Sequence, residues 1–242
     1  MELSQLILTA IAALIALTIH EYAHGYVAYK LGDNTAKSLG RLSLNPVKHL
    51  DPFGVICMVL FRFGWANPVP INPRNFKSPR KGFALTALAG PATNVIVGFF
   101  TAFLYLLCVR FAIKTNVALL DNLQINLIRF LSYFFSVNIG LGVFNLIPVP
   151  PFDGSRILNV ILPDRLYFKI MKYERQIYWA VIAWLFLGDT VYTALLRVPI
   201  VASIPALRTI VKIFSLSNIL SDAITAIATG MLRFWSLIPF LG

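Results

Sequence analysis

The chain has 242 residues, a length typical of one or two domains. Apolar residues make up 58% of it and charged residues only 13%, against about 25% charged residues in soluble domains. This excludes an ordinary water-soluble domain and favours lipid as the solvent. The net charge is +11, but the basic residues fall between long apolar stretches. Basic residues in such places set the orientation of a protein in a membrane, so we expect no nucleic-acid partner.

Five apolar stretches are long enough to cross a membrane as helices, which takes about 20 residues. Three of them contain an acidic residue, at Glu21, Asp189 and Asp222. In chain order the five stretches are 3–29, 83–109, 130–152, 177–196 and 213–232. The sequence therefore predicts an all-α polytopic membrane protein with about five transmembrane helices.

The connection 30–82 is predicted to contain short β-structure and to be partly re-entrant. Polar and apolar residues alternate over 41–44, as in a short strand, and prolines recur through the rest. Residues 55–61 are apolar but too few to span a membrane, which favours a re-entrant or interfacial segment.

The C-terminal region is predicted to be a separate unit. Within 204–216, Arg208 and Lys212 lie on one helix face and apolar residues on the other, which is typical of a helix in the membrane interface. We therefore divide the chain into a membrane-embedded core, 1–196, and a C-terminal interfacial helix with the last membrane helix, 197–242.

The distribution of Lys and Arg predicts the orientation. The connection 30–82 carries nine of them, 110–126 carries two, and 148–176 carries five. Basic connections stay on the cytoplasmic side, so 30–82 and 148–176 are expected in the cytoplasm.

The sequence His20-Glu21-Tyr22-Ala23-His24 lies inside the first apolar stretch. Two histidines four residues apart share one face of a helix and can bind one metal ion, with the glutamate between them as a general base. Ionisable groups inside a membrane are costly and usually functional, so a metal site is favoured over a packed pair of histidines.

A catalytic zinc needs a third protein ligand and one open position. The candidates are His49, Asp51, Asp153, Asp189 or a more distant acid. The histidine pair lies roughly 9–15 Å below the cytoplasmic end of its helix, at 1.5 Å per residue. Asp153 follows a proline-rich turn at the cytoplasmic end of the third span and is expected at a similar depth, whereas Asp189 is expected to be deeper, as an interhelical hydrogen-bond partner.

Two other polar residues could serve the site. Asn94 lies about 16 Å along the second span, at the depth of the histidine pair. Its amide could donate a hydrogen bond to an oxyanion or could join two helices. His49 lies in the connection 30–82, where a histidine is more often structural or exposed than catalytic.

Three sequence elements together resemble the site-2 protease family of intramembrane zinc metalloproteases, in its compact branch without PDZ or CBS domains. They occur in the family's order, as His20-Glu21-x-x-His24, Gly90-Pro91-x-x-Asn94 and Asn145-x-x-Pro148-x-Pro150-x-x-Asp153-Gly154.

The resemblance implies the role of each residue. His20, His24 and Asp153 would bind one Zn²⁺ per chain, and Glu21 would activate a water molecule. Asn94 would assist catalysis, and Asn145 would help to shape the site.

The predicted function is therefore that of an intramembrane zinc metalloprotease, with 1–196 as its catalytic core. It would hydrolyse peptide bonds in or near the transmembrane segments of other membrane proteins. The expected setting is the cell membrane, with lipid around a multi-pass chain and the active site near the cytoplasmic side. An extended substrate could pair with backbone around 40–44 or 68–71.

Two alternatives use the same residues. One is a membrane-bound zinc protease that cuts soluble or interfacial peptides. The other is a zinc-binding membrane protein without enzymatic activity.

Overall fold

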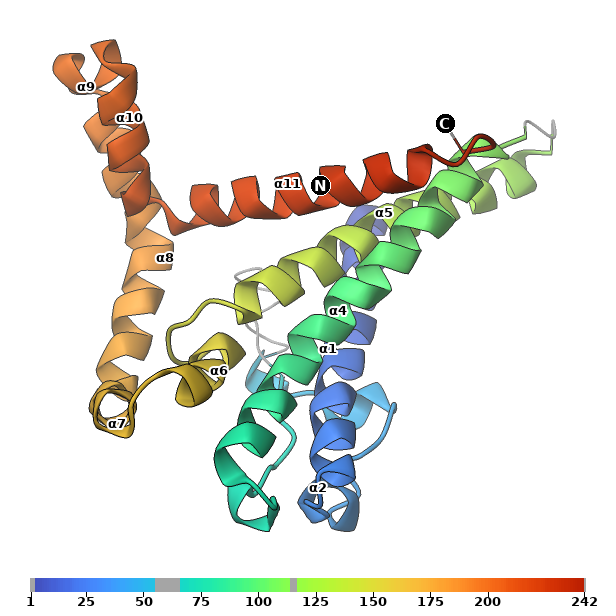
Figure 1. The fold of residues 1–242 in the computed structure, drawn as a ribbon. Helices are drawn as coiled ribbons and strands as arrows, with labels where there is room; N and C mark the ends of the chain where they lie inside the picture. The colour runs from blue at the N-terminus through green and yellow to red at the C-terminus, as the bar shows by residue number, and fades with distance from the viewer. Residues whose placement is uncertain (1–2, 55–65, 114–116, 242) are drawn as a thin grey trace.

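The structure is a computed structural model that describes residues 3–54, 66–113 and 117–241. Within these ranges it is built from helices and connecting turns (Figure 1). In chain order the elements are α1 (Leu3–Lys30), α2 (Thr35–Ser38), η1 (Pro46–Lys48), η2 (Pro73–Asn75), α4 (Pro79–Arg110), α5 (Ala118–Asn145), α6 (Asp153–Ile161), α7 (Asp164–Lys172), α8 (Glu174–Leu196), α9 (Pro199–Ser203), α10 (Pro205–Val211), η3 (Lys212–Phe214) and α11 (Leu216–Ser236).

Three helices, α1, α4 and α5, pack together as the centre of the molecule, and α11 lies across α4 and α5 (Figure 1). A buried cluster lies where α4, α5 and α11 meet, and it contains Ala102, Phe135 and Ile139. In Figure 1, α8 stands to the side of the central helices and is joined to them through α6 and α7 and through α11.

Among the described residues, α1, α4 and α5 are long and apolar enough to cross a membrane. Two bent pairs also meet the criterion, one within α8 and one formed by α10–η3 and α11, so the count rises to five if each pair is one span. The predicted helical class is therefore confirmed, and the structure supports three to five candidate spans where the sequence predicted about five. The placement of 204–216 in the interface stays a prediction, as does the division of the chain at residue 196.

The third span does not lie where the sequence placed it. The prediction was 130–152, but α5 covers Ala118–Asn145. It begins earlier because the helix continues through Asp121 and Arg129, two charged residues in its N-terminal half. It ends earlier because Pro148, which follows closely, cannot continue an α-helix.

The expected β-structure in 30–82 is wrong for the described part of that connection, where the one bridge pairs Leu50 with Ala66. Asn45 and Asn72 instead cap short 3₁₀ turns that begin at prolines, because each side-chain oxygen accepts a backbone N–H two residues on. Local side-chain hydrogen bonds of this kind compete with strand pairing. The predicted re-entrant segment 55–61 falls outside the described residues.

Asp33 fixes this connection to the end of α1. Its buried carboxylate accepts hydrogen bonds from Thr35, from the Asn72 backbone N–H and from the Asn75 side chain. Burial alone raises the pKa of a carboxyl group, but these hydrogen bonds outweigh it and hold the pKa of Asp33 below its ordinary value. The segment before Asn72 is thereby held against α1, beside the functional site.

Candidate metal centre

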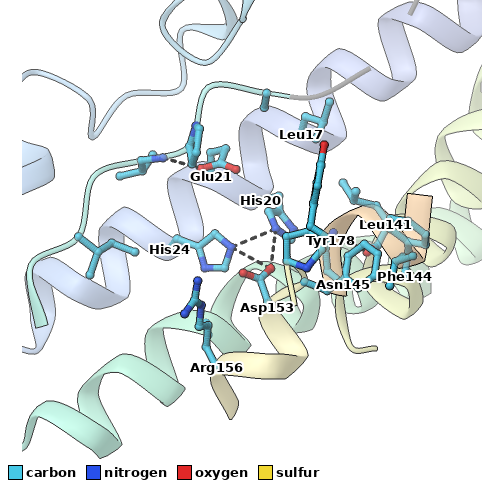
Figure 2. Close-up of a pocket in the computed structure, with 18 of the residues that line it drawn as sticks. Leu17, His20, Glu21, His24, Leu141, Phe144, Asn145, Asp153, Arg156 and Tyr178 are labelled. Carbon is cyan, nitrogen blue, oxygen red and sulfur yellow. Dashed lines mark hydrogen bonds and ion pairs between the residues drawn. The ribbon is translucent and has the colours of Figure 1, made fainter. Parts of the chain in front are cut away.

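Three potential metal ligands converge at the centre of the molecule. His20 and His24 project from α1, and Asp153 is the first residue of α6 (Figure 2). The two Nε2 atoms are 3.0 Å apart, and Asp153 Oδ2 lies 3.1 Å from the first and 3.2 Å from the second. Of the four named candidates for a third ligand, Asp153 is the one that joins the histidines within the described residues.

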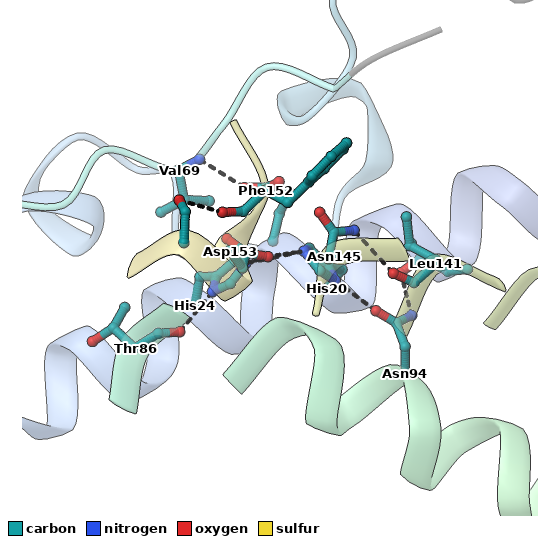
Figure 3. Close-up of polar contacts among 12 residues, drawn as sticks. His20, His24, Val69, Thr86, Asn94, Leu141, Asn145, Phe152 and Asp153 are labelled. Carbon is teal, nitrogen blue, oxygen red and sulfur yellow. Dashed lines mark hydrogen bonds and ion pairs between the residues drawn. The ribbon is translucent and has the colours of Figure 1, made fainter. Parts of the chain in front are cut away.

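The outer nitrogen of each imidazole is already engaged. His24 Nδ1 lies 2.7 Å from the Thr86 carbonyl oxygen, and His20 Nδ1 lies 2.6 Å from Asn94 Oδ1 (Figure 3). A carbonyl can only accept, so each Nδ1 carries the proton and each Nε2 presents a lone pair to the other ligands. Two lone pairs and a carboxylate facing one point suit a divalent cation, and two nitrogens with one oxygen suit zinc.

Gly90 makes room for the imidazoles on the facing helix, α4. A Cβ atom at this position would lie 2.4 Å from His24 Nε2 and 2.7 Å from His20 Nε2. Any side chain there would collide with the ligands. This explains a glycine in the interior of a helix, where it otherwise costs stability.

The turn between α5 and α6 brings Asp153 to the histidines. A Cβ atom at Gly154 would lie 2.3 Å from the Leu146 carbonyl oxygen, so glycine allows the start of α6 to touch the end of α5.

Glu21 lies beside the ligands and is fixed by the connection 30–82. Its Oε2 accepts a hydrogen bond of 2.8 Å from the Val69 backbone N–H. Gly25, one turn further along α1, allows this approach, because a Cβ atom there would lie 3.1 Å from Val69 Cγ1. Arg41 holds the same segment from outside through the carbonyls of Asn67 and Pro68.

A pocket of about 540 Å³ opens beside Glu21 and the three potential ligands (Figure 2). Its walls come from α1, the extended segment 66–71, α4, α5, α6 and α8. They are mainly apolar, with residues such as Leu17, Phe144, Phe152, Val181 and Leu185. Glu21 and the three potential ligands thus face a cavity lined mainly by apolar side chains.

Asn94 has a different position from that of the oxyanion donor considered from the sequence. Its side chain is fully buried, and its Nδ2 donates to the Ala16 carbonyl and to Asn138 Oδ1. The amide hydrogens are therefore committed to other helices, and the oxygen faces His20. Asn145 does line the pocket, and its Nδ2 donates to the Leu141 carbonyl.

The remaining candidates have structural environments. His49 is buried, and its Nε2 donates to the Ser43 carbonyl at 2.7 Å. Asp51 accepts the Gly54 backbone N–H. Asp189 on α8 bonds Ser215 and Ser217 beside α11, which confirms its expected role as an interhelical hydrogen-bond partner.

Sequence reasoning missed three contributors to the site. The Thr86 backbone carbonyl leaves no signal in a sequence, because every residue has one. Asn138 could have been found as a buried amide in an apolar stretch. Arg156, which lines the pocket and pairs with Glu174, could have been found one turn after Asp153.

Comparison with known proteins identifies related chains. Residues 8–188 match the model of peptidase family M50. The chain is 43% identical over 164 residues to the "Putative zinc metalloprotease YwhC" of Bacillus subtilis, an alignment that covers 68% of this chain and 73% of the relative.

More distant relatives also match. The chain is 29% identical over 164 residues to the "Zinc metalloprotease MJ0392" of Methanocaldococcus jannaschii, which covers 67% of this chain and 37% of the relative. It is 24% identical over 230 residues to the "Putative zinc metalloprotease Rip2" of Mycobacterium tuberculosis, which covers 93% of this chain and 79% of the relative. No solved structure matches significantly.

Proposed function

The chain belongs to peptidase family M50, the site-2 protease family, and on this premise we propose that it is a zinc metalloprotease that hydrolyses peptide bonds in or near the transmembrane segments of other membrane proteins. The observation that carries the proposal is the position of the His-Glu-x-x-His pair and Asp153. They face an apolar pocket between helices of membrane-spanning length.

The enzyme is a zinc metalloprotease, and His20, His24 and Asp153 are the proposed zinc ligands. When bound, zinc supplies a Lewis acid that polarises the scissile carbonyl and acidifies a water molecule. The acceptors at both Nδ1 atoms support this assignment, because they leave both Nε2 atoms available as ligands.

Glu21 is the proposed general base. Its carboxylate takes a proton from the attacking water and later passes the proton to the leaving amine. The Val69 N–H holds one carboxylate oxygen, and within the described part of the chain the other oxygen has no hydrogen-bond donor. That arrangement orients Glu21 while one oxygen stays able to accept the proton.

Asn94 acts on the metal ligand in this proposal and not on the substrate. Its oxygen accepts the Nδ1–H of His20, which fixes the orientation of the imidazole. Two features support a site near the cytoplasmic face of the cell membrane. One is the depth of His20 along the first span, and the other is the basic character of the connections around the site.

The pocket suits an extended apolar segment. A helical substrate must unwind first, because its carbonyls are engaged in helical hydrogen bonds and no water is available in lipid to replace them. The extended residues Pro68, Val69 and Ile71 line the pocket and offer backbone beside which an unwound substrate would lie.

The test compares the wild type with Glu21→Gln on a panel of single-span membrane proteins and on soluble peptides of the same sequence. Glu21→Gln should keep one zinc per chain and lose cleavage, because it removes the base and leaves the ligands. Cleavage of the membrane-embedded substrates supports the proposal. Cleavage restricted to the soluble peptides would assign the enzyme to that substrate class instead.

A further inference from the structure

Two buried amides connect the three central helices at the level of the metal centre. Asn94 on α4 and Asn138 on α5 are both fully buried, and Asn94 Nδ2 lies 2.8 Å from Asn138 Oδ1. Asn94 Oδ1 in turn lies 2.6 Å from His20 Nδ1 on α1. Hydrogen bonds therefore run from α5 through α4 to a proposed zinc ligand.

Backbone carbonyls, which can only accept, fix the direction of this series of hydrogen bonds at both amides. Asn138 Nδ2 donates to the Phe134 carbonyl at 2.8 Å, so Asn138 must turn its oxygen towards Asn94. Asn94 Nδ2 donates to that oxygen and to the Ala16 carbonyl, so Asn94 must turn its own oxygen towards His20.

The consequence for His20 is a fixed tautomer. An oxygen opposite Nδ1 requires the proton on Nδ1 and the lone pair on Nε2, where zinc would bind. If the Asn94 amide were rotated by half a turn, its NH₂ group would face Nδ1 and favour the proton on Nε2. Rotation would also bring two amide oxygens together in a fully buried site, where unpaired polar groups are costly.

Small residues on α4 and α5 are needed for this contact. A Cβ atom at Gly98 would lie 2.5 Å from Ile139 Cδ1, and one at Gly142 would lie 2.9 Å from Val95 Cγ2 and 3.1 Å from the Pro91 carbonyl oxygen. Glycine at both positions lets the helices approach closely enough for the two short amide side chains to meet.

We propose that Asn138 is a positioning residue: it holds the Asn94 amide in the orientation that keeps the His20 proton on Nδ1 and Nε2 free for zinc. His24 needs no such device, since its Nδ1 meets the Thr86 backbone carbonyl, which cannot rotate independently. The proposal rests on the assignment of His20 as a zinc ligand under the proposed function.

The experiment uses the full chain in detergent and four variants, of which His20→Ala removes the proposed ligand itself. Asn138→Leu removes the oxygen that Asn94 needs, at similar size. Asn138→Asp still offers an oxygen to Asn94 and serves as the conservative rescue. Asn126→Leu, at an exposed position on the same helix, is the matched control.

Two readouts are independent of proteolysis. Zinc affinity is measured by competition with a chelator, and the tautomers are read by ¹⁵N NMR of metal-free protein labelled at its three histidines. Asn138→Leu should bind zinc about 10–100-fold more weakly, as for other partners that orient metal ligands, and should show mixed tautomers at His20. Asn138→Asp and Asn126→Leu should remain close to the wild type in both measurements.

Wild-type affinity with an unchanged His20 tautomer in Asn138→Leu would overturn the proposal. Equal loss of zinc in the Leu and Asp variants, with the tautomer unchanged, would also overturn it, because it would indicate a packing role. If His20→Ala itself retained wild-type zinc affinity, the failure would lie in the metal-site assignment of the proposed function, and this inference would fall with it.

Discussion

Replacement of Gly90 by alanine should displace both imidazoles without changing any proposed ligand. The added Cβ atom would lie 2.4 Å from His24 Nε2, whereas ordinary van der Waals contact begins at 3.4 Å. The rings or the helix must therefore shift by about 1 Å. Movement of α4 is opposed by α5 behind it, where Gly142 already approaches the Pro91 carbonyl.

A shift of this size has a large expected effect on catalysis. Misplacement of reacting groups by about 1 Å can cost roughly 100-fold in rate. Changes to the groups that orient metal ligands typically cost about 10–100-fold in metal affinity. We therefore expect Gly90→Ala to bind zinc about 10–100-fold more weakly and to cleave its substrate about 100-fold more slowly.

The assay is chelator competition on purified protein, together with cleavage of a single-span substrate. Gly230→Ala on α11 is the matched control, because a Cβ atom there meets nothing within 4 Å. Both substitutions raise helix propensity by about 1 kcal/mol, so the control corrects for that gain. Wild-type zinc affinity and activity in Gly90→Ala would refute the placement of the histidines against α4.

Three further predictions follow from the site and its surroundings. Asp153→Ala should lower zinc occupancy, whereas Asp51→Ala should not; metal analysis of both variants decides the third ligand. Asp33→Asn should destabilise the protein by about 1–3 kcal/mol in thermal unfolding at neutral pH. Because the folded pKa of Asp33 is depressed, its stabilisation is present above the unfolded pKa near 3.8 and is lost as the pH falls through the folded value, so the two proteins should converge in acid. An Asn-Pro pair moved along a cleavable transmembrane segment should speed cleavage when it lies in the cytoplasmic half, as mapped by mass spectrometry, and equal rates for an unbroken Leu-rich segment would contradict the unwinding step.

The sequence predicted the elements whose signals are local. Long apolar stretches identified the helices of α1 and α4 to within a few residues, because lipid imposes a length and a composition on every span. The spacing of His20 and His24 predicted their common direction, because a helix places residues four apart on one face. Family membership, expected from three motifs, is confirmed by the match over residues 8–188.

Predictions failed where local side-chain hydrogen bonds or helix-ending prolines override the pattern of polar and apolar residues. The alternation at 41–44 suggested a strand, but asparagine caps and prolines made turns of that connection. The uncharged stretch at 130–152 was placed too far along the chain, because Pro148 ends a helix whereas Arg129 does not.

What the sequence by itself determined is the chemistry: a histidine pair with a glutamate between them on a membrane-length helix, and a short list of residues that could complete a zinc site. What only the tertiary structure decided is which groups meet. Asp153 reaches the histidines, the Asn94 oxygen faces His20, and the Val69 N–H holds Glu21. The physical reason is that these contacts join residues 48 to 133 positions apart, and they depend on close helix approach at glycines such as Gly90 and on backbone carbonyls such as that of Thr86. Neither the close approach of two helices nor the position of a backbone carbonyl leaves a local pattern in the sequence.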